Sequence, residues 1–102
     1  MAAAKSERRI YAVSSNQLFG VCVTALGQLR ATITRHDVEQ GVIVATIGAS
    51  SLAPISELVL ALHPGGAGRT ELTATWRAHK RGGDQRLLAV FLASVDTLIG
   101  QA

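Results

Sequence analysis

The segment from Arg69 to His79 constrains the fold more than any other, because its side chains alternate strictly between apolar and polar. Leu72, Ala74 and Trp76 occupy every second position, and threonines and cations lie between them. Successive side chains of a β-strand point to opposite faces, so the alternation predicts a strand with one apolar and one polar face. Such a strand belongs to an antiparallel sheet that covers a core on one side and meets solvent or a partner on the other.

Other segments also have β-strand character. The predicted strands are 10–13, 28–36, 42–47, 56–63 and 69–79. Turn residues separate several of them, with Asp37 to Gly41 ending one segment and Pro64 to Gly68 another. These two turns predict hairpins, and the glycines of the second favour a flexible connection between strands.

Two segments have helical periodicity instead, each with a single apolar stripe. The first is predicted over 15–27, with an N-cap in the cluster that begins at Ser14 and an end at Leu26 and Gly27. The second is predicted over 85–99, with Asp84 as its N-cap. Cys22 falls in the apolar stripe of the first helix, so we expect its thiol to be buried and unreactive.

The resulting order, β-α-β-β-β-β-α, predicts an α+β fold: a single antiparallel sheet of four to five strands with two helices packed on one face. A chain of 102 residues supports one domain. We expect a flexible leader at residues 1–9 and a single α+β domain at residues 10–102.

Composition excludes several classes of protein. Leu, Ile, Val and Phe make up about 28% of the chain, above the roughly 20% below which chains are disordered. The longest apolar run, from Leu87 to Ala93, is far too short to span a membrane. We therefore expect a soluble protein, cytoplasmic as the sequence stands, or periplasmic or envelope-bound if a signal peptide was removed.

No pattern of residues predicts catalysis, a metal site or a cofactor. His36, His63 and His79 lie near the ends of three predicted strands, without the spacing of a zinc site. The glycines at 65–68 join two strands and lack the lysine of a phosphate-binding loop. We therefore predict that the protein is not an enzyme and that it binds neither metal nor cofactor.

A basic segment follows the alternating strand. The candidate interaction surface consists of Arg77, His79, Lys80, Arg81 and Arg86. The net charge of +3 is modest, and charged residues make up only 17% of the chain. Neither an aromatic stacking platform nor a strongly basic helix accompanies the segment, so nucleic-acid binding is the weaker interpretation.

The order of signals between residues 11 and 92 resembles a group of small bacterial domains. The resemblance rests on Tyr11 and Val13, the Leu26-Gly27 pair, Asp37 to Gly41, the glycine-rich turn before Arg69, and a final Leu- and Phe-rich helix. It points to uncharacterised domains of the cell-envelope lipoprotein type, and the layout is similar to the helix-grip domains of the assembly lipoprotein BamC. The resemblance implies a bacterial, non-enzymatic binding module whose sheet grips a long C-terminal helix. No lipobox cysteine stands near the start of the chain.

These observations favour a small non-catalytic interaction or assembly module that binds a protein partner or a second copy of itself. Two alternatives remain open. One is RNA or DNA binding through the basic segment at 77–86. The other is a carrier for a small apolar ligand held between the final helix and the sheet.

Overall fold

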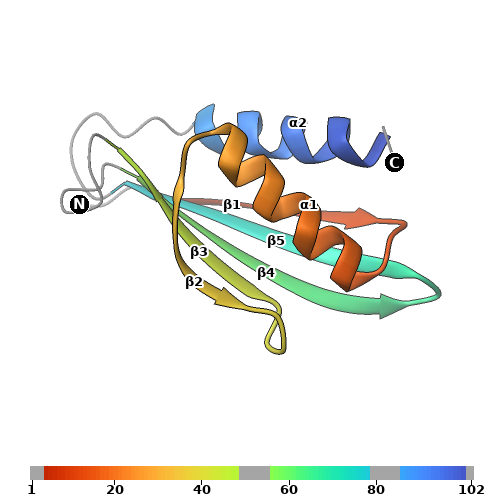
Figure 1. Cartoon of the computed structure of the whole chain (residues 1–102). Helices are drawn as coiled ribbons and strands as arrows, with labels where there is room; N and C mark the ends of the chain where they lie inside the picture. The colour runs from red at the N-terminus through yellow and green to blue at the C-terminus, as the bar shows by residue number, and fades with distance from the viewer. Residues whose placement is uncertain (1–3, 49–55, 79–85, 101–102) are drawn as a thin grey trace.

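The structure is a computed structural model that describes residues 4–48, 56–78 and 86–100. In these residues a five-stranded antiparallel sheet carries two helices on one face (Figure 1). The elements in chain order are β1 (Ala4–Tyr11), α1 (Ser15–Gln28), β2 (Thr32–Asp37), β3 (Val42–Ile47), β4 (Ser56–Gly66), β5 (Arg69–Ala78) and α2 (Arg86–Gly100). The strands lie in the order β1-β5-β4-β3-β2, and every neighbouring pair is antiparallel. This architecture confirms the predicted α+β fold, with five strands in the sheet.

The core lies between the two helices and the side of the sheet that faces them, which we call the inner face. Alternate residues of β3, β4 and β5 supply its floor, and the apolar stripes of α1 and α2 cover it. Leu18, Leu60, Leu72 and Phe91 are fully buried there, and Trp76 is 3% exposed. The alternation in β5 and both helical stripes therefore have the orientation that the sequence predicts.

α1 begins as predicted and ends later than predicted. The Ser14 hydroxyl accepts a hydrogen bond from the backbone N–H of Gln17 at 3.2 Å, which caps the first turn. At the other end Arg30, and not Gly27, adopts the left-handed conformation, with a φ of 58°. Its N–H donates to the Gly27 carbonyl, and the N–H of Ala31 donates to the Leu26 carbonyl. This pair of hydrogen bonds is a Schellman motif.

The predicted end of the first helix at Gly27 is therefore wrong. The predicted start of the next strand at residue 28 is wrong as well. The period-two pattern of apolar residues starts inside the turn that closes the helix, because Leu29 and Ala31 pack against the core from that turn. β2 begins only at Thr32.

The N-terminal segment corrects a second prediction. Residues 4–9, expected to belong to a flexible leader, form most of strand β1. β1 pairs with β5 along its whole length, from Ala4 opposite Arg77 to Tyr11 opposite Thr70. Its side chains are mostly exposed, so the strand shows no apolar alternation from which it could have been predicted. β5 supplies the partner that orders it.

Two tight turns shape the hairpins. The Asp37 carboxylate accepts from the N–H of Gln40 at 3.0 Å, and Gly41 follows with a φ of 66°. A Cβ at Gly41 would lie 2.5 Å from the carbonyl oxygen of Leu62, so only glycine fits there. The β4–β5 hairpin turns through Ala67 and Gly68, both with positive φ, as a two-residue turn between right-twisted strands requires. Both predicted hairpins are confirmed.

Side-chain hydrogen bonds fasten α2 to the rest of the molecule. The Tyr11 hydroxyl donates to the Asp96 carboxylate at 2.8 Å, and the Ser94 hydroxyl donates to the side-chain oxygen of Gln28 at 3.2 Å. Neither helix that the structure describes is long and apolar enough to cross a membrane. The predicted N-cap Asp84 lies outside the described residues.

Candidate interaction surface

The side of the sheet that faces away from both helices, the outer face, carries the polar side of the alternating strand. In β5, Thr73, Thr75 and Arg77 point outward because their neighbours Leu72, Ala74 and Trp76 point into the core. Neither helix covers this face, since α1 and α2 both lie on the opposite side (Figure 1). Of the residues that the sequence predicts as an interaction surface, Arg77 lies on this face.

Three of the rows of neighbouring side chains that the strand register defines cross the centre of the outer face. The first row is Asp37, Val42, Ala61, Thr73 and Arg8; the second is Arg35, Val44, Val59, Thr75 and Ser6; the third is Thr32, Thr46, Glu57, Arg77 and Ala4. Val42, Val44, Val59 and Ala61 sit at the centre, and each is half-buried. The centre is thus aliphatic, with threonines beside it and charges around it.

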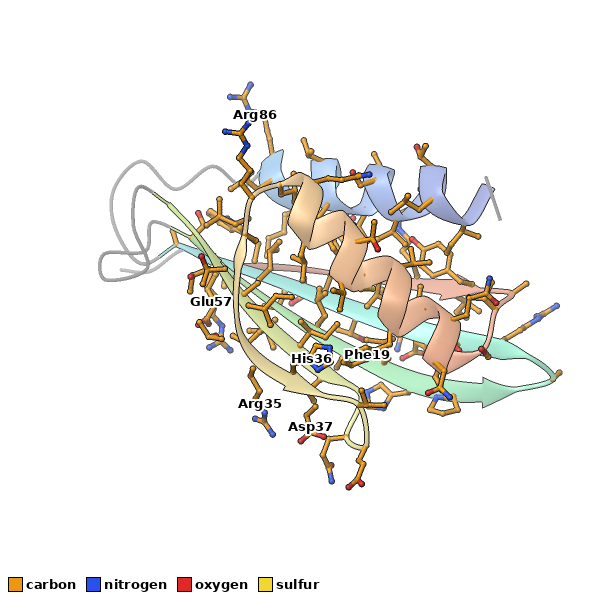
Figure 2. All side chains as sticks on the ribbon, in the orientation of Figure 1. Phe19, Arg35, His36, Asp37, Glu57 and Arg86 are labelled. Atoms are coloured by element: carbon orange, nitrogen blue, oxygen red, sulfur yellow. The ribbon has the colours of Figure 1, made fainter. Side chains whose placement is uncertain are left out.

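The charges on this face are of both signs. Arg8 lies 4.0 Å from Glu71 near the β1 edge, and Arg35 lies 3.6 Å from Asp37 at the β2 edge. Figure 2 shows Arg35, Asp37 and Glu57 on the side of the sheet away from the helices. A face with this mixture suits a protein surface better than the uniformly negative backbone of a nucleic acid.

The structure separates the basic residues that the sequence grouped together. Arg77 is exposed on the outer face, opposite Glu57 in the register. Arg86 is the first residue of α2, and its side chain points away from the sheet (Figure 2). His79, Lys80 and Arg81 lie outside the described residues. Among the described residues, the basic contribution to the outer face from this segment is therefore Arg77.

The inner face offers little chemistry in the described part of the chain. Its buried polar residues there are Ser56 and Thr70, neither of which is an acid or a base at neutral pH. Burial raises the pKa of the Cys22 thiol to about 12, so the thiol stays protonated and is not a nucleophile. The predicted burial of Cys22 is confirmed. No group of three or more metal-binding side chains occurs among the residues described.

The described residues line at least two hollows outside the core. One, of about 160 Å³, lies between the first turn of α1 and the β2–β3 turn, with Asn16, Phe19 and His63 in its lining. The other, of about 360 Å³, is an open groove between Gln28 and the outward side of α2 near Val90. Neither lies between α2 and the sheet, where the carrier hypothesis places its ligand.

The ring of His36 has a packing role that sequence reasoning missed. It meets the ring of Phe19 edge-on, with 4.8 Å between the ring centroids and 87° between their planes (Figure 2). The pairing joins β2 to α1. Strict alternation from Ile33 would place Arg35, and not His36, on the inner face. The register shift between Ile33 and Arg35 reverses this and turns His36 toward the helix.

Comparison with known proteins places the fold. No family model matches the chain, and no curated protein matches its sequence. Among solved structures, Ara h 8.0201 is similar over 100% of both chains, with a TM-score of 0.61 and 10% identity. Norcoclaurine synthase from Thalictrum flavum, solved in complex with dopamine and hydroxybenzaldehyde, is similar over 99% of this chain and 88% of its own, with a TM-score of 0.65 and 9% identity.

These neighbours define the chain as a protein with a helix-grip, or Bet v 1-like, fold. The helix-grip layout that the sequence suggested is therefore confirmed, whereas the likeness to the assembly lipoprotein BamC is not shown. At 9–10% identity these likenesses show the fold alone.

Proposed function

We propose that the protein is a small non-catalytic interaction module that binds a protein partner, or a second copy of itself, through the outer face of its sheet. The observation that carries this proposal is that helices cover one face of the sheet and not the other. The inner face is packed beneath two helices, while the outer face presents half-buried aliphatic side chains that nothing in the described structure covers. Aliphatic centres with charged margins are typical of protein contact surfaces.

The alternatives have less support. An enzyme of this fold would need an acid, a base or a nucleophile in a closed site, and the buried polar residues of the described part are Ser56 and Thr70. A carrier would need space between α2 and the sheet, where Leu88, Phe91 and Val95 are at most 1% exposed. For nucleic acid, the acidic Glu57 and Glu71 stand beside the cations of the outer face.

Site-specific photo-crosslinking in the source cells tests the proposal. A photoreactive amino acid replaces Val44 at the centre of the outer face in one variant, and Val90 on the solvent side of α2 in the matched control. We expect one partner protein, or a second copy of the chain, to be crosslinked from Val44 and not from Val90, and to be lost on Arg77→Glu. Equal adducts from both positions would contradict the proposal.

A salt titration with duplex RNA and duplex DNA tests the nucleic-acid alternative. We expect no binding tighter than the roughly 10⁻⁴ M that non-specific contacts give at physiological salt. Micromolar binding that is lost in the double variant Lys80→Ala, Arg81→Ala would replace the proposed function with the nucleic-acid one.

A further inference from the structure

The open edge of β1 is the second uncovered feature of the sheet. β1 is the terminal strand in the order β1-β5-β4-β3-β2. One side of its backbone pairs with β5, and among the described residues no strand lies on the other side. Over eight residues its pairing with β5 shows no shift in register. The strand contains neither proline nor glycine. It therefore presents a straight, regular row of N–H and C=O groups.

The opposite edge of the sheet is different. β2 has six residues, and its register shifts between Ile33 and Arg35. Short edge strands and bulges are devices that prevent a further strand from pairing. Of the two edges, only the backbone of β1 is regular enough to accept another strand along its whole length.

The side chains of β1 restrict what that strand can be. Lys5, Arg8 and Arg9 outnumber Glu7, and the side chains of Arg8 and Arg9 are 72% and 46% exposed. Their present partners, Glu71 at 4.0 Å and Glu7 at 3.3 Å, are on the surface, where an ion pair contributes little. A second copy of β1 would bring the same net positive charge against this edge and would be repelled.

Ile10 adds an apolar element to the same edge. It is 65% exposed, more than Val38 and Val90, the other large exposed hydrophobic residues of the described part. Ile10 and Arg8 are two positions apart, so both lie on the outer face of the sheet. A strand placed beside β1 would therefore meet an aliphatic group and a cation on the same face, two residues apart.

We infer that β1 accepts an extended acidic segment of a partner protein as a sixth strand of the sheet. This inference rests on the proposed function and names the chemistry of its partner. Backbone hydrogen bonds along β1 give the affinity, and side chains give the selection, with a carboxylate opposite Arg8 and an aliphatic residue opposite Ile10. The added strand extends the outer face beyond its β1 margin.

Amide hydrogen exchange followed by NMR, with a defined peptide as probe, tests the inference. The probe is a blocked octapeptide in which every second residue is alternately glutamate or valine, with threonine between them, so that one face of the strand carries both a carboxylate and an aliphatic group two positions apart. The control replaces each glutamate with lysine. We expect the acidic peptide to slow exchange about tenfold or more at alternate amides of β1, those that point away from β5. The lysine peptide should have no such effect, and added salt should weaken binding of the acidic one.

Matched variants locate the contact. Arg8→Glu should weaken binding of the acidic peptide about tenfold, which corresponds to the loss of one opposite-charge cross-strand pair and the gain of a like-charge one. Arg35→Glu makes the same change in net charge on the β2 edge and should leave binding within a factor of two or so. Thermal unfolding of both variants checks that the sheet remains intact.

The outcomes separate the inference from the proposed function. No slowing at β1, equal binding of the two peptides, or equal effects of the two variants would overturn the inference. If the peptide instead perturbs the amides of Val44 and Val59, the inference fails and the outer-face function stands. Failure of the crosslinking experiment at Val44, with slowed exchange at β1, would overturn the outer-face function and leave the edge as the binding element.

Discussion

The two faces of the sheet are made from the same strands but differ in burial and in role. On the inner face, Leu60 and Leu72 are buried beneath helices. On the outer face, the intervening residues Val59, Ala61 and Thr73 are only half-buried and have no helix above them. The inner residues therefore hold the fold, and the outer residues contribute little to it. The difference shows how a chain of this size can keep one face for stability and present the other to a partner.

The largest effect should come from the centre of the inner face. Phe91 is fully buried between α2 and the sheet, so Phe91→Ala should destabilise the protein by about 3–5 kcal/mol. Val59→Thr on the outer face keeps the shape of the side chain and should change stability by no more than about 0.5 kcal/mol. Urea unfolding of both variants measures the contrast. Similar losses would mean that a hidden contact covers the outer face.

The two buried hydroxyls of the inner face, those of Ser56 and Thr70, differ in whether they have a hydrogen-bond partner. The Thr70 hydroxyl donates to the Val13 carbonyl at 2.8 Å, whereas the Ser56 hydroxyl has no hydrogen-bond partner in the described structure. Thr70→Val leaves the Val13 carbonyl unpaired and should destabilise the protein by about 1–3 kcal/mol. Ser56→Ala removes a hydroxyl that is already unpaired, so stability should stay the same or rise. Chemical unfolding of the two variants decides, and a large loss for Ser56→Ala would reveal a partner for its hydroxyl.

The Cys22 thiol predicts how stability depends on pH. Burial raises its pKa from 9.0 to about 12 in the folded protein. Between these values the unfolded chain loses the proton and the folded chain keeps it, so ionisation favours unfolding. Stability that is fully present below pH 9 should therefore fall as the pH rises toward 12. Tyr11, whose pKa is raised by burial and by the nearby Asp96 carboxylate, acts in the same direction.

Cys22→Ala supplies the control for this pH dependence. The variant should be less stable at neutral pH, because it leaves a small cavity, and its stability should fall less steeply in the alkaline range. Urea unfolding at intervals from below pH 9 upward measures both slopes. Iodoacetamide should also react slowly with the native wild-type thiol and quickly with the unfolded one. Rapid reaction in the native state would place Cys22 at the surface.

The smallest effect concerns the solvent side of α1. A Cβ at Gly20 would meet no atom within 4 Å, so Gly20→Ala should stabilise the protein by about 1 kcal/mol through helix propensity. Gly41→Ala, where the φ is 66° and the Leu62 carbonyl is in the way, should destabilise it. Thermal unfolding ranks the pair, and a loss of stability on Gly20→Ala would show that its backbone is needed for a contact.

The sequence predicts the inner face better than the outer one, for a physical reason. Burial imposes periodicity, so the strand that contains Trp76 and the helix that contains Phe91 can be recognised from spacing alone. β1 has no buried face of its own, and its order comes from pairing with β5, which no local pattern shows. The sequence does not reveal where α1 ends, because an arginine, Arg30, adopts the left-handed conformation that is most common for glycine.

The candidate surface was predicted only in part, because facing directions depend on tertiary structure. The alternation correctly placed Arg77 and the threonines of β5 on the outer face. Closeness in the sequence predicts that Arg86 and Arg77 share a surface, but the Arg86 side chain, on the first residue of α2, points away from the sheet. The aliphatic centre formed by Val42, Val44 and Val59 comes from the register between β3 and β4, which spacing along one strand does not determine.

The pairing of β1 with β5 also sets the order in which the molecule can assemble. Tyr11 lies opposite Thr70, so the strand made first must wait for a partner that leaves the ribosome almost sixty residues later. The β3–β4 and β4–β5 neighbours are closer in sequence and can meet sooner. Contacts between distant parts of a chain slow folding, which typically takes milliseconds to seconds in proteins rich in them. During synthesis β4 is therefore an open edge, and β1 has no strand partner, until β5 emerges and pairs with both. In that interval a nascent chain of this fold is most exposed to pairing with other chains.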